Sequence, residues 1–150
     1  MGAEGFSGAQ IVMVAASGDH SVALGAEGKV WTWGWGCRGQ LVHNDEESRL
    51  VPTQLAGETL GCAAVVLVAA GSAHTVAVTT EEALWVWGYE ECGQLGLGDQ
   101  VNRLAPALVA VEAAFGGWQV LTVSCVAFHT LVVTKDGALY TSYRNFRKNI

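Results

Sequence analysis

The chain has 150 residues, of which 51% are hydrophobic and only 15% are charged, so a disordered segment is excluded and a packed core is expected. The formal net charge of −6 repels phosphate backbones, which makes direct nucleic-acid binding a poor prediction.

The first predicted elements are short strands separated by glycine-rich turns. Residues 11–15 form an apolar run, and a second run with Val22 and Leu24 follows His20. A turn over residues 25–28 then leads to a third run that contains Trp31 and Trp33. Apolar side chains at every second position inside such short runs predict β-strands. No stretch of the repeating part shows apolar residues at the 3.6-residue period of a helix. Polar segments over 45–49 and 98–103, each followed by a proline, are interpreted as loops that connect blades.

The chain repeats itself when it is shifted by 54 residues. Segment 16–24 then lies over 70–78, segment 29–34 lies over 83–88, and the Gly-Gln-Leu at 39–41 lies over 93–95. A third copy begins at residue 126, so that His20, His74 and His129 occupy equivalent places. A repeat of this length with three or four strands predicts one propeller blade per repeat. We therefore expect a single repeat array over 1–150, with blades over about 10–56 and 64–110 and a degenerate one over 119–143.

The third repeat departs from the first two. Trp33 and Trp87 stand thirteen residues after His20 and His74, whereas Ser142 stands thirteen residues after His129. The Gly-Gln-Leu motif is absent from the third repeat, and residues 144–150 are rich in basic residues. We interpret these residues as a solvated basic tail, and the third repeat as a cap on the array or as the mark of a truncated product.

The ordered motifs G-x-x-H-[ST]-hydrophobic, G-x-[LV]-[WY]-x-W-G and G-Q-L-G-x-G-D resemble the regulator of chromosome condensation repeat. The resemblance covers about 130 of the 150 residues and implies an all-β fold of propeller blades. Members of that family usually close a ring of seven blades. Because this chain holds about two and a half repeats, an incomplete ring is expected. Either the chain is a fragment, or it assembles with other copies, or its array stays open.

The repeated residues are predicted to be structural rather than catalytic. A catalytic site needs one set of converging side chains, not a copy in every blade. A histidine that recurs in every blade is instead typical of a side chain that hydrogen-bonds neighbouring backbone and fixes strand geometry. The adjacent Ser17, Asp19 and His20 cannot form a triad, since triad members converge from separate elements. The glycine pattern over 34–39 lacks the helix and acidic residue of a dinucleotide site. Structural roles are therefore assigned to the following residues: His20, His74, His129, Trp33, Trp87, Gly34 and Gly88.

Two aromatic residues lie where a partner could contact them. Trp35 and Tyr89 occupy equivalent positions just beyond a strand end, in loops, and exposed aromatic side chains on loops are typical of binding hot spots. We predict a partner-binding face that combines them with Asp19, Arg38 and Glu90. No metal site is predicted, because the four cysteines contain no CxxC pair, and no cofactor is expected.

Three functions remain open. The broadest is a non-catalytic scaffold for protein interactions, and the resemblance also implies nucleotide exchange on a small GTPase of the Ran type. For exchange, Asp19 alone matches the acidic or histidine residues that precede the motif histidine in that branch. Ultraviolet-B sensing, another activity in the family, is not expected, since Gly18, Ser72 and Ala127 replace its tryptophans.

The third function is a structural subunit of a larger assembly. An open array exposes strand edges and an apolar blade face, which predicts a protein partner or self-association to cover them. No membrane partner is expected, because the longest apolar run is far shorter than a membrane span. Without a secretory signal pattern, the expected location is intracellular, either cytoplasmic or nuclear.

Overall fold

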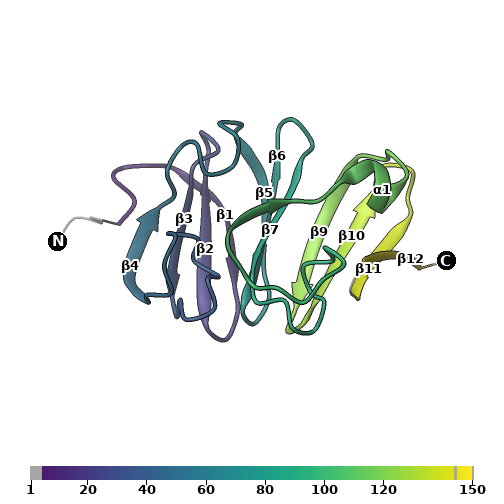
Figure 1. Ribbon diagram of the computed structural model, residues 1–150. Coiled ribbons are helices and arrows are strands. Elements are labelled where there is room, and N and C mark those ends of the chain that lie inside the picture. Colours follow the sequence, from purple (N-terminus) through teal and green to yellow (C-terminus); the bar gives the residue numbers. More distant parts are fainter. Residues whose placement is uncertain (1–4, 144, 150) are drawn as a thin grey trace.

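The computed structural model describes residues 5–143 and 145–149, which form three four-stranded antiparallel sheets (Figure 1). The sheets stand side by side as three blades, and the first strand of each blade contacts the first strand of the next. The strands are β1 (Ile11–Ala16), β2 (His20–Gly25), β3 (Val30–Gly34), β4 (Arg49–Gln54), β5 (Val65–Ala70), β6 (His74–Thr79), β7 (Leu84–Gly88), β8 (Arg103–Leu108), β9 (Val120–Val126), β10 (His129–Thr134), β11 (Leu139–Tyr143) and β12 (Asn145–Asn149). The fold is thus the predicted all-β array of propeller blades, and its ring is incomplete.

The core consists of two apolar layers, one between each pair of neighbouring blades. In the second blade, Val76 and Val86 face the third blade, whereas Ala77 and Trp87 face the first. Successive side chains of a strand point to opposite faces, so a central blade that is covered on both sides buries both sets. All six residues of β6 are buried for this reason. The array is therefore held together by contacts between blades as well as by hydrogen bonds within each sheet.

The outermost strand of each of the first two blades contains a proline. Pro52 lies in β4 and Pro106 lies in β8, and each strand pairs on one side only within its four-stranded sheet. A proline has no N–H to donate to a ladder, so an edge strand tolerates it. The polar segments before these prolines join the third and fourth strands of one blade, and the prediction that they connect blades was wrong. The connections between blades run instead over residues 55–64 and 109–119.

The third blade has four strands, although the sequence predicted a solvated tail over 144–150. Residues Asn145–Asn149 form β12, which pairs with β11 from Tyr143↔Asn145 to Leu139↔Asn149. The prediction was wrong for these residues because Phe146 is buried, with 7% of its surface exposed. Its ring centroid lies 5.0 Å from that of Phe115. Residues 144 and 150 lie outside the described part of the chain.

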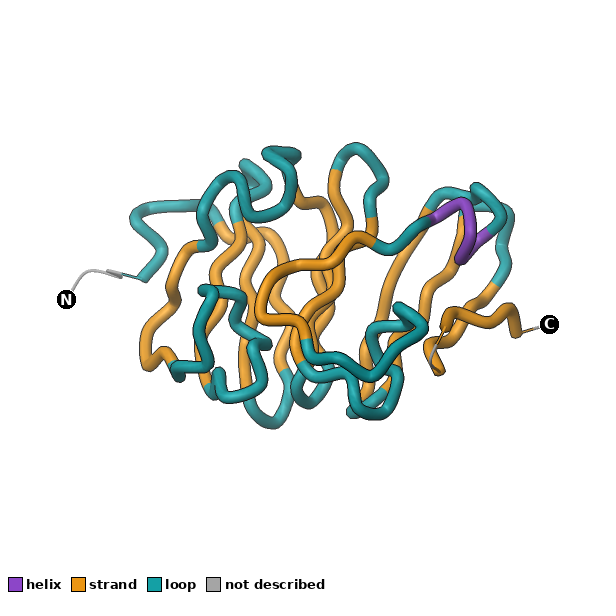
Figure 2. The backbone as a smooth tube through the Cα atoms, viewed as in Figure 1, coloured by secondary structure: helices purple, strands orange, loops and turns teal. Residues whose placement is uncertain are grey.

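A short helix closes the layer between the second and third blades (Figure 2). Helix α1 (Val111–Phe115) lies in the connection from β8 to β9, and the sequence did not predict it. It ends at Gly116, which adopts the left-handed conformation that commonly terminates a helix. Phe115 is fully buried there and packs edge-on against Tyr140. Within the described residues, no helix is long and apolar enough to cross a membrane.

Candidate partner-binding surface

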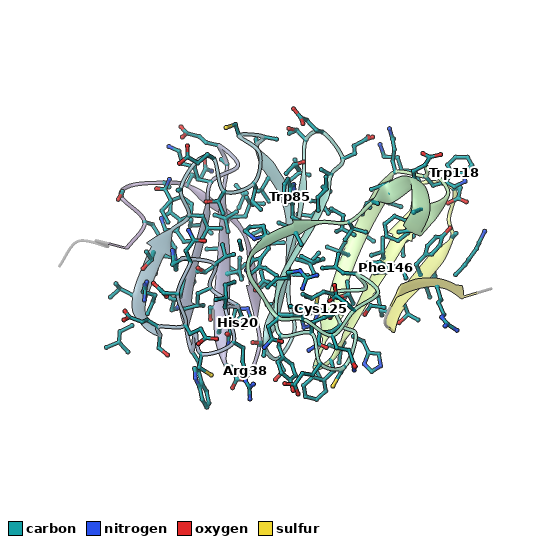
Figure 3. The ribbon with its side chains drawn as sticks, viewed as in Figure 1. His20, Arg38, Trp85, Trp118, Cys125 and Phe146 are labelled. Atoms are coloured by element: carbon teal, nitrogen blue, oxygen red, sulfur yellow. The ribbon has the colours of Figure 1, made fainter. Side chains whose placement is uncertain are left out.

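The loops that follow the first and third strands of the blades all lie at one end of the array. Antiparallel strands alternate in direction, so the connections β1–β2 and β3–β4 emerge at the same edge of a sheet. The second blade repeats this arrangement, and the third adds its β9–β10 turn. Figure 3 shows Arg38 at this end and Trp118 at the opposite one. We refer to the end that carries Arg38 as the Arg38 end.

The Arg38 end is tied together by hydrogen bonds between the first two blades. The hydroxyl of Thr75 donates to the backbone oxygen of Gln40 over 2.9 Å, and the indole N–H of Trp87 donates to the same oxygen over 2.8 Å. His20 Nε2 lies 2.7 Å from the Thr75 oxygen. Because the threonine proton is already directed at Gln40, His20 must donate its Nε2 proton to Thr75. His20 therefore links one blade to the next, through a side chain rather than through the neighbouring backbone that the sequence suggested.

The second and third blades are joined in the same way. His74 Nε2 lies 3.0 Å from the Thr130 hydroxyl oxygen, and Thr130 donates to the backbone oxygen of Gln94 over 2.8 Å. Burial lowers the pKa of both His20 and His74 to about 4, and Asp19 partly opposes this decrease at His20. Both imidazoles are therefore neutral at pH 7, and a neutral imidazole can still carry the Nε2 proton that is donated to the threonine.

His129 is placed differently from the other two motif histidines. It is exposed, because no described blade follows the third one. The third repeat also has Ser142 where Trp33 and Trp87 stand, and β11 leads to β12 without the loop that carries Gly-Gln-Leu. In the first blade, Trp33 is partly covered by Phe6, and the two ring centroids lie 5.8 Å apart. The structural role predicted for His129 is thus not accompanied by a contact between blades.

Gly34 and Gly88 place the two loop aromatics. These glycines have φ of 111° and 103°, and a Cβ on either would lie within 2.6 Å of the backbone oxygen of Asp19 or Ala73. Only glycine allows this approach, since both the dihedral angle and the space exclude a side chain. The next residues then bond to the same turns: the Trp35 N–H donates to the Asp19 oxygen over 2.8 Å, and the Tyr89 N–H donates to the Ala73 oxygen over 2.9 Å. The repeated glycines therefore fix Trp35 beside Asp19.

Four of the five predicted partner-binding residues line one hollow of about 310 Å³ at the Arg38 end. They are Asp19, Trp35, Arg38 and Tyr89. The Arg38 guanidinium carbon lies 4.8 Å from the centre of the Tyr89 ring, which is a cation–π distance. The Tyr89 hydroxyl in turn donates to a Glu91 carboxylate oxygen over 2.6 Å. The structure thus brings together loops of two blades that are far apart in the sequence.

The fifth predicted residue, Glu90, does not lie on this surface. Its side chain is fully buried, and its Oε2 accepts the backbone N–H of Leu95 over 2.5 Å. Its own N–H donates to the Asn102 side chain over 2.9 Å. Glu90 therefore holds the loop between β7 and β8 in shape, and the prediction that it contacts a partner was wrong. Burial raises its pKa to about 7, mainly through loss of solvation.

The raised pKa of Glu90 predicts a dependence of stability on pH. Because the folded-state pKa lies above the unfolded value near 4.5, the contribution is fully present below pH 4.5 and is lost as the pH rises through about 7. The natural chain should lose stability from pH 5 to pH 8 as Glu90 ionises, whereas Glu90→Gln has no such carboxyl group. We therefore expect the unfolding free energy of Glu90→Gln, relative to that of the natural chain, to rise by on the order of 1–3 kcal/mol from pH 5 to pH 8. Urea unfolding at both pH values measures this difference.

The two buried histidines act in the opposite direction and serve as an internal control. Their pKa values are lowered, so their contribution is present above pH 6.5 and is lost as the pH falls through about 4. The natural chain and Glu90→Gln both keep these histidines, so the effect of the histidines cancels from the difference between the two unfolding free energies. An unfolding free-energy difference that stays constant from pH 5 to pH 8 would contradict the raised pKa.

Two features of the surface were not identified from the sequence. Phe128 lines the hollow with 45% of its surface exposed, although its neighbourhood was interpreted only as part of the repeat. The side chains of Gln40 and Gln94 each close a turn, by accepting the N–H of Arg38 over 2.9 Å and of Cys92 over 3.0 Å. The recurrence of Gly-Gln-Leu in phase was a signal for the second feature. No repeated signal marked Phe128, since Asp19 and Ala73 occupy its equivalent positions.

Family models for the regulator of chromosome condensation (RCC1) repeat match most of the chain. One model matches residues 27–78 and 81–133, and a second matches residues 11–40 and 65–94. Curated relatives include the ultraviolet-B receptor UVR8 of Arabidopsis thaliana, which is 39% identical over 89% of this chain and 29% of the relative. The human E3 ubiquitin-protein ligase HERC2 is 36% identical over 92% of this chain and 3% of the relative. The zebrafish (Danio rerio) RCC2 homolog is 34% identical over 81% of this chain and 24% of the relative.

Solved structures of similar proteins agree with the fold. Human WBSCR16 superposes with a TM-score of 0.79 at 28% identity, over 89% of this chain and 33% of that structure. Yeast RCC1 bound to Kap60 superposes with a TM-score of 0.76 at 28% identity, over 91% of this chain and 30% of that structure. The chain therefore spans a third or less of each of the proteins that it matches here.

Proposed function

Because this chain belongs to the regulator of chromosome condensation repeat family, we propose that it is a non-catalytic module that binds another protein through its Arg38 end. The observation that carries the proposal is the hollow lined by Asp19, Trp35, Arg38 and Tyr89. Trp35 exposes 55% of its surface there, and aromatic and arginine side chains around a hollow are typical of binding hot spots.

The blades beneath the hollow support this proposal because buried hydrogen bonds join them and already occupy their polar side chains. His20 and His74 are buried and neutral and bond to threonines of the next blade, so neither is available as a general base. Loops on a rigid scaffold lose less conformational entropy on binding than mobile loops do. The role of the end loops is therefore recognition rather than chemistry.

A capture experiment with matched tryptophan variants tests the proposed function. We expect the immobilised chain to retain one or more proteins from a cell extract. A double Trp35→Ala, Tyr89→Ala variant should retain at least about tenfold less of each of these proteins, as expected for hot-spot residues. Trp118→Ala is the control, because Trp118 is exposed to a similar extent, 52%, but lies at the opposite end. Quantitative mass spectrometry of the retained proteins gives the comparison. Equal retention by the double variant and the control would overturn the proposal.

Nucleotide exchange on a small GTPase of the Ran type is the second candidate. It is supported by the likeness to yeast Prp20p, whose crystal structure is described together with binding to Gsp1p and histones. The chain covers 31% of that structure, at 27% identity. In this chain, the partly exposed Asp19 lines the hollow at the Arg38 end. Accelerated release of labelled GDP from such a GTPase, lost in Asp19→Asn, would favour exchange over the scaffold role.

A structural subunit is the third candidate, and the open third blade supports it. Leu139 and Val126 are exposed on that blade, and His129 has no following blade to contact within the described residues. An apolar blade face is an aggregation liability unless a neighbour covers it. A fixed mass above that of one chain in light scattering, constant over a concentration series, would favour this role.

A further inference from the structure

Three aromatic side chains from three blades surround the hollow at the Arg38 end. Trp35 follows β3, Tyr89 follows β7, and Phe128 lies in the turn between β9 and β10. Trp35 and Phe128 expose 55% and 45% of their surfaces. Two large rings exposed around one hollow leave apolar area in water that a ligand could cover. The hollow is therefore suited to a flat or apolar group that lies between rings.

The charge around the hollow favours a cation as its occupant. Asp19 has no described cationic side chain within salt-bridge distance, and its nearest polar partner is the Ser72 hydroxyl at 3.5 Å. Two other arginines in the described loops of this end are already paired: Arg49 lies 2.5 Å from Asp45, and Arg103 lies 2.6 Å from Asp99. The Asp19 carboxylate thus forms no salt bridge with a cationic side chain in the described part of the chain, although Arg38 lines the same hollow.

One ring of the hollow already holds a guanidinium. Arg38 lies over Tyr89 at 4.8 Å, and Glu91 accepts the hydroxyl of the same tyrosine. A guanidinium is planar, stacks on aromatic faces and is more weakly hydrated than an ammonium, so it enters such a site at lower desolvation cost than a lysine does. Trp35 and Phe128 offer the same kind of ring without an internal cation within cation–π distance in the described structure.

We propose that the hollow binds an arginine side chain of a partner polypeptide, with the guanidinium against the rings of Trp35 and Phe128 and its charge opposite Asp19. This inference rests on the proposed function, since it names the chemistry that the partner must present. Arg38 carries a like charge into the hollow. It is offset by Asp19 and by Glu91 behind Tyr89, so the incoming arginine meets a net negative surrounding.

Fluorescence polarisation with defined peptides tests this proposal. The probe is a fluorescein-labelled decapeptide of alternating glycine and arginine, and matched peptides carry lysine, citrulline or glutamate in place of arginine. We expect the arginine peptide to bind about threefold to tenfold more tightly than the lysine peptide. Citrulline keeps the flat shape but lacks the charge, and should lose at least about tenfold.

Variants of the full chain assign the binding to the hollow. Trp35→Ala and Phe128→Leu should each weaken binding of the arginine peptide by about fivefold to thirtyfold, whereas Trp118→Ala should leave it unchanged. Asp19→Asn should weaken binding at low salt and reduce its dependence on ionic strength. Phe128→Leu keeps an apolar side chain, and circular dichroism confirms that each variant is folded.

Two results would overturn the inference. One is equal affinity for the arginine and citrulline peptides, and the other is unchanged binding in both Trp35→Ala and Phe128→Leu. If the peptides fail in this way while capture of proteins still depends on Trp35 and Tyr89, the arginine specificity is wrong and the interaction role stands. If the variants that lack Trp35 behave like the natural chain in both experiments, both proposals fall.

Discussion

Replacing Trp87 with alanine should lower the free energy of unfolding by about 3–5 kcal/mol. Trp87 has none of its surface exposed and belongs to the apolar layer between the first and second blades. Its removal leaves a cavity that the surrounding strands, fixed by their ladders, cannot fill. It also takes one of two donors from the backbone oxygen of Gln40, which joins the two blades. Urea unfolding followed by circular dichroism measures the change.

Two further variants separate the contributions of Trp87. Trp87→Phe keeps most of the apolar area but removes the indole N–H, so it should cost less than the alanine variant and remain foldable if that variant does not. Trp118→Ala removes an exposed tryptophan from the same chain and should change the unfolding free energy by no more than about 0.5 kcal/mol. If Trp87→Ala were as stable as Trp118→Ala, the packing of Trp87 between the first and second blades would be contradicted.

Replacing Phe146 with alanine should lower the free energy of unfolding by about 3–5 kcal/mol, although it lies four residues from the chain end. Phe146 packs against Phe115 of helix α1 and over Gly96, where a Cβ would lie 2.7 Å from its ring. Its loss would open the layer between the second and third blades and release β12 from β11. Calorimetric or urea unfolding gives the comparison.

Arg147→Ala is the matched control for Phe146, because Arg147 is exposed in the same strand. It should be close to neutral, within about 0.5 kcal/mol. A solvated tail would instead make both substitutions neutral. Equal stability of the Phe146 and Arg147 variants would therefore restore the interpretation of this segment as a tail and remove β12 from the third blade.

The first three strands of each of the first two blades could be predicted because their signals are local and repeated. The alternation around Trp31 and Trp33 recurs around Trp85 and Trp87, and β3 and β7 occupy those positions. A side-chain period of two depends only on the geometry of an extended backbone, so it can be recognised without tertiary information. The recurrence of each motif in phase then predicted a propeller blade rather than an isolated hairpin.

Residues in the loops could be predicted as a group but not one by one. Tyr89, Glu90 and Glu91 are consecutive, yet Tyr89 lines the hollow while Glu90 is buried beneath it. The direction of each side chain in a loop is set by the turn, and here the N–H of Leu95 and the side chain of Asn102 set it. Neither contact leaves a periodic pattern in the sequence.

The sequence by itself determined that this protein is an array of blades, where the first three strands of each blade lie, and that Trp35 and Tyr89 occupy equivalent loop positions just beyond a strand end. It could do so because strand alternation and repeat period are properties of neighbouring residues. The tertiary structure alone decided that Phe146 completes the third blade, that Glu90 is buried and that Phe128 joins Trp35 at one hollow. Each of these depends on a contact with a distant segment, and packing against distant segments decides which side chains leave the solvent.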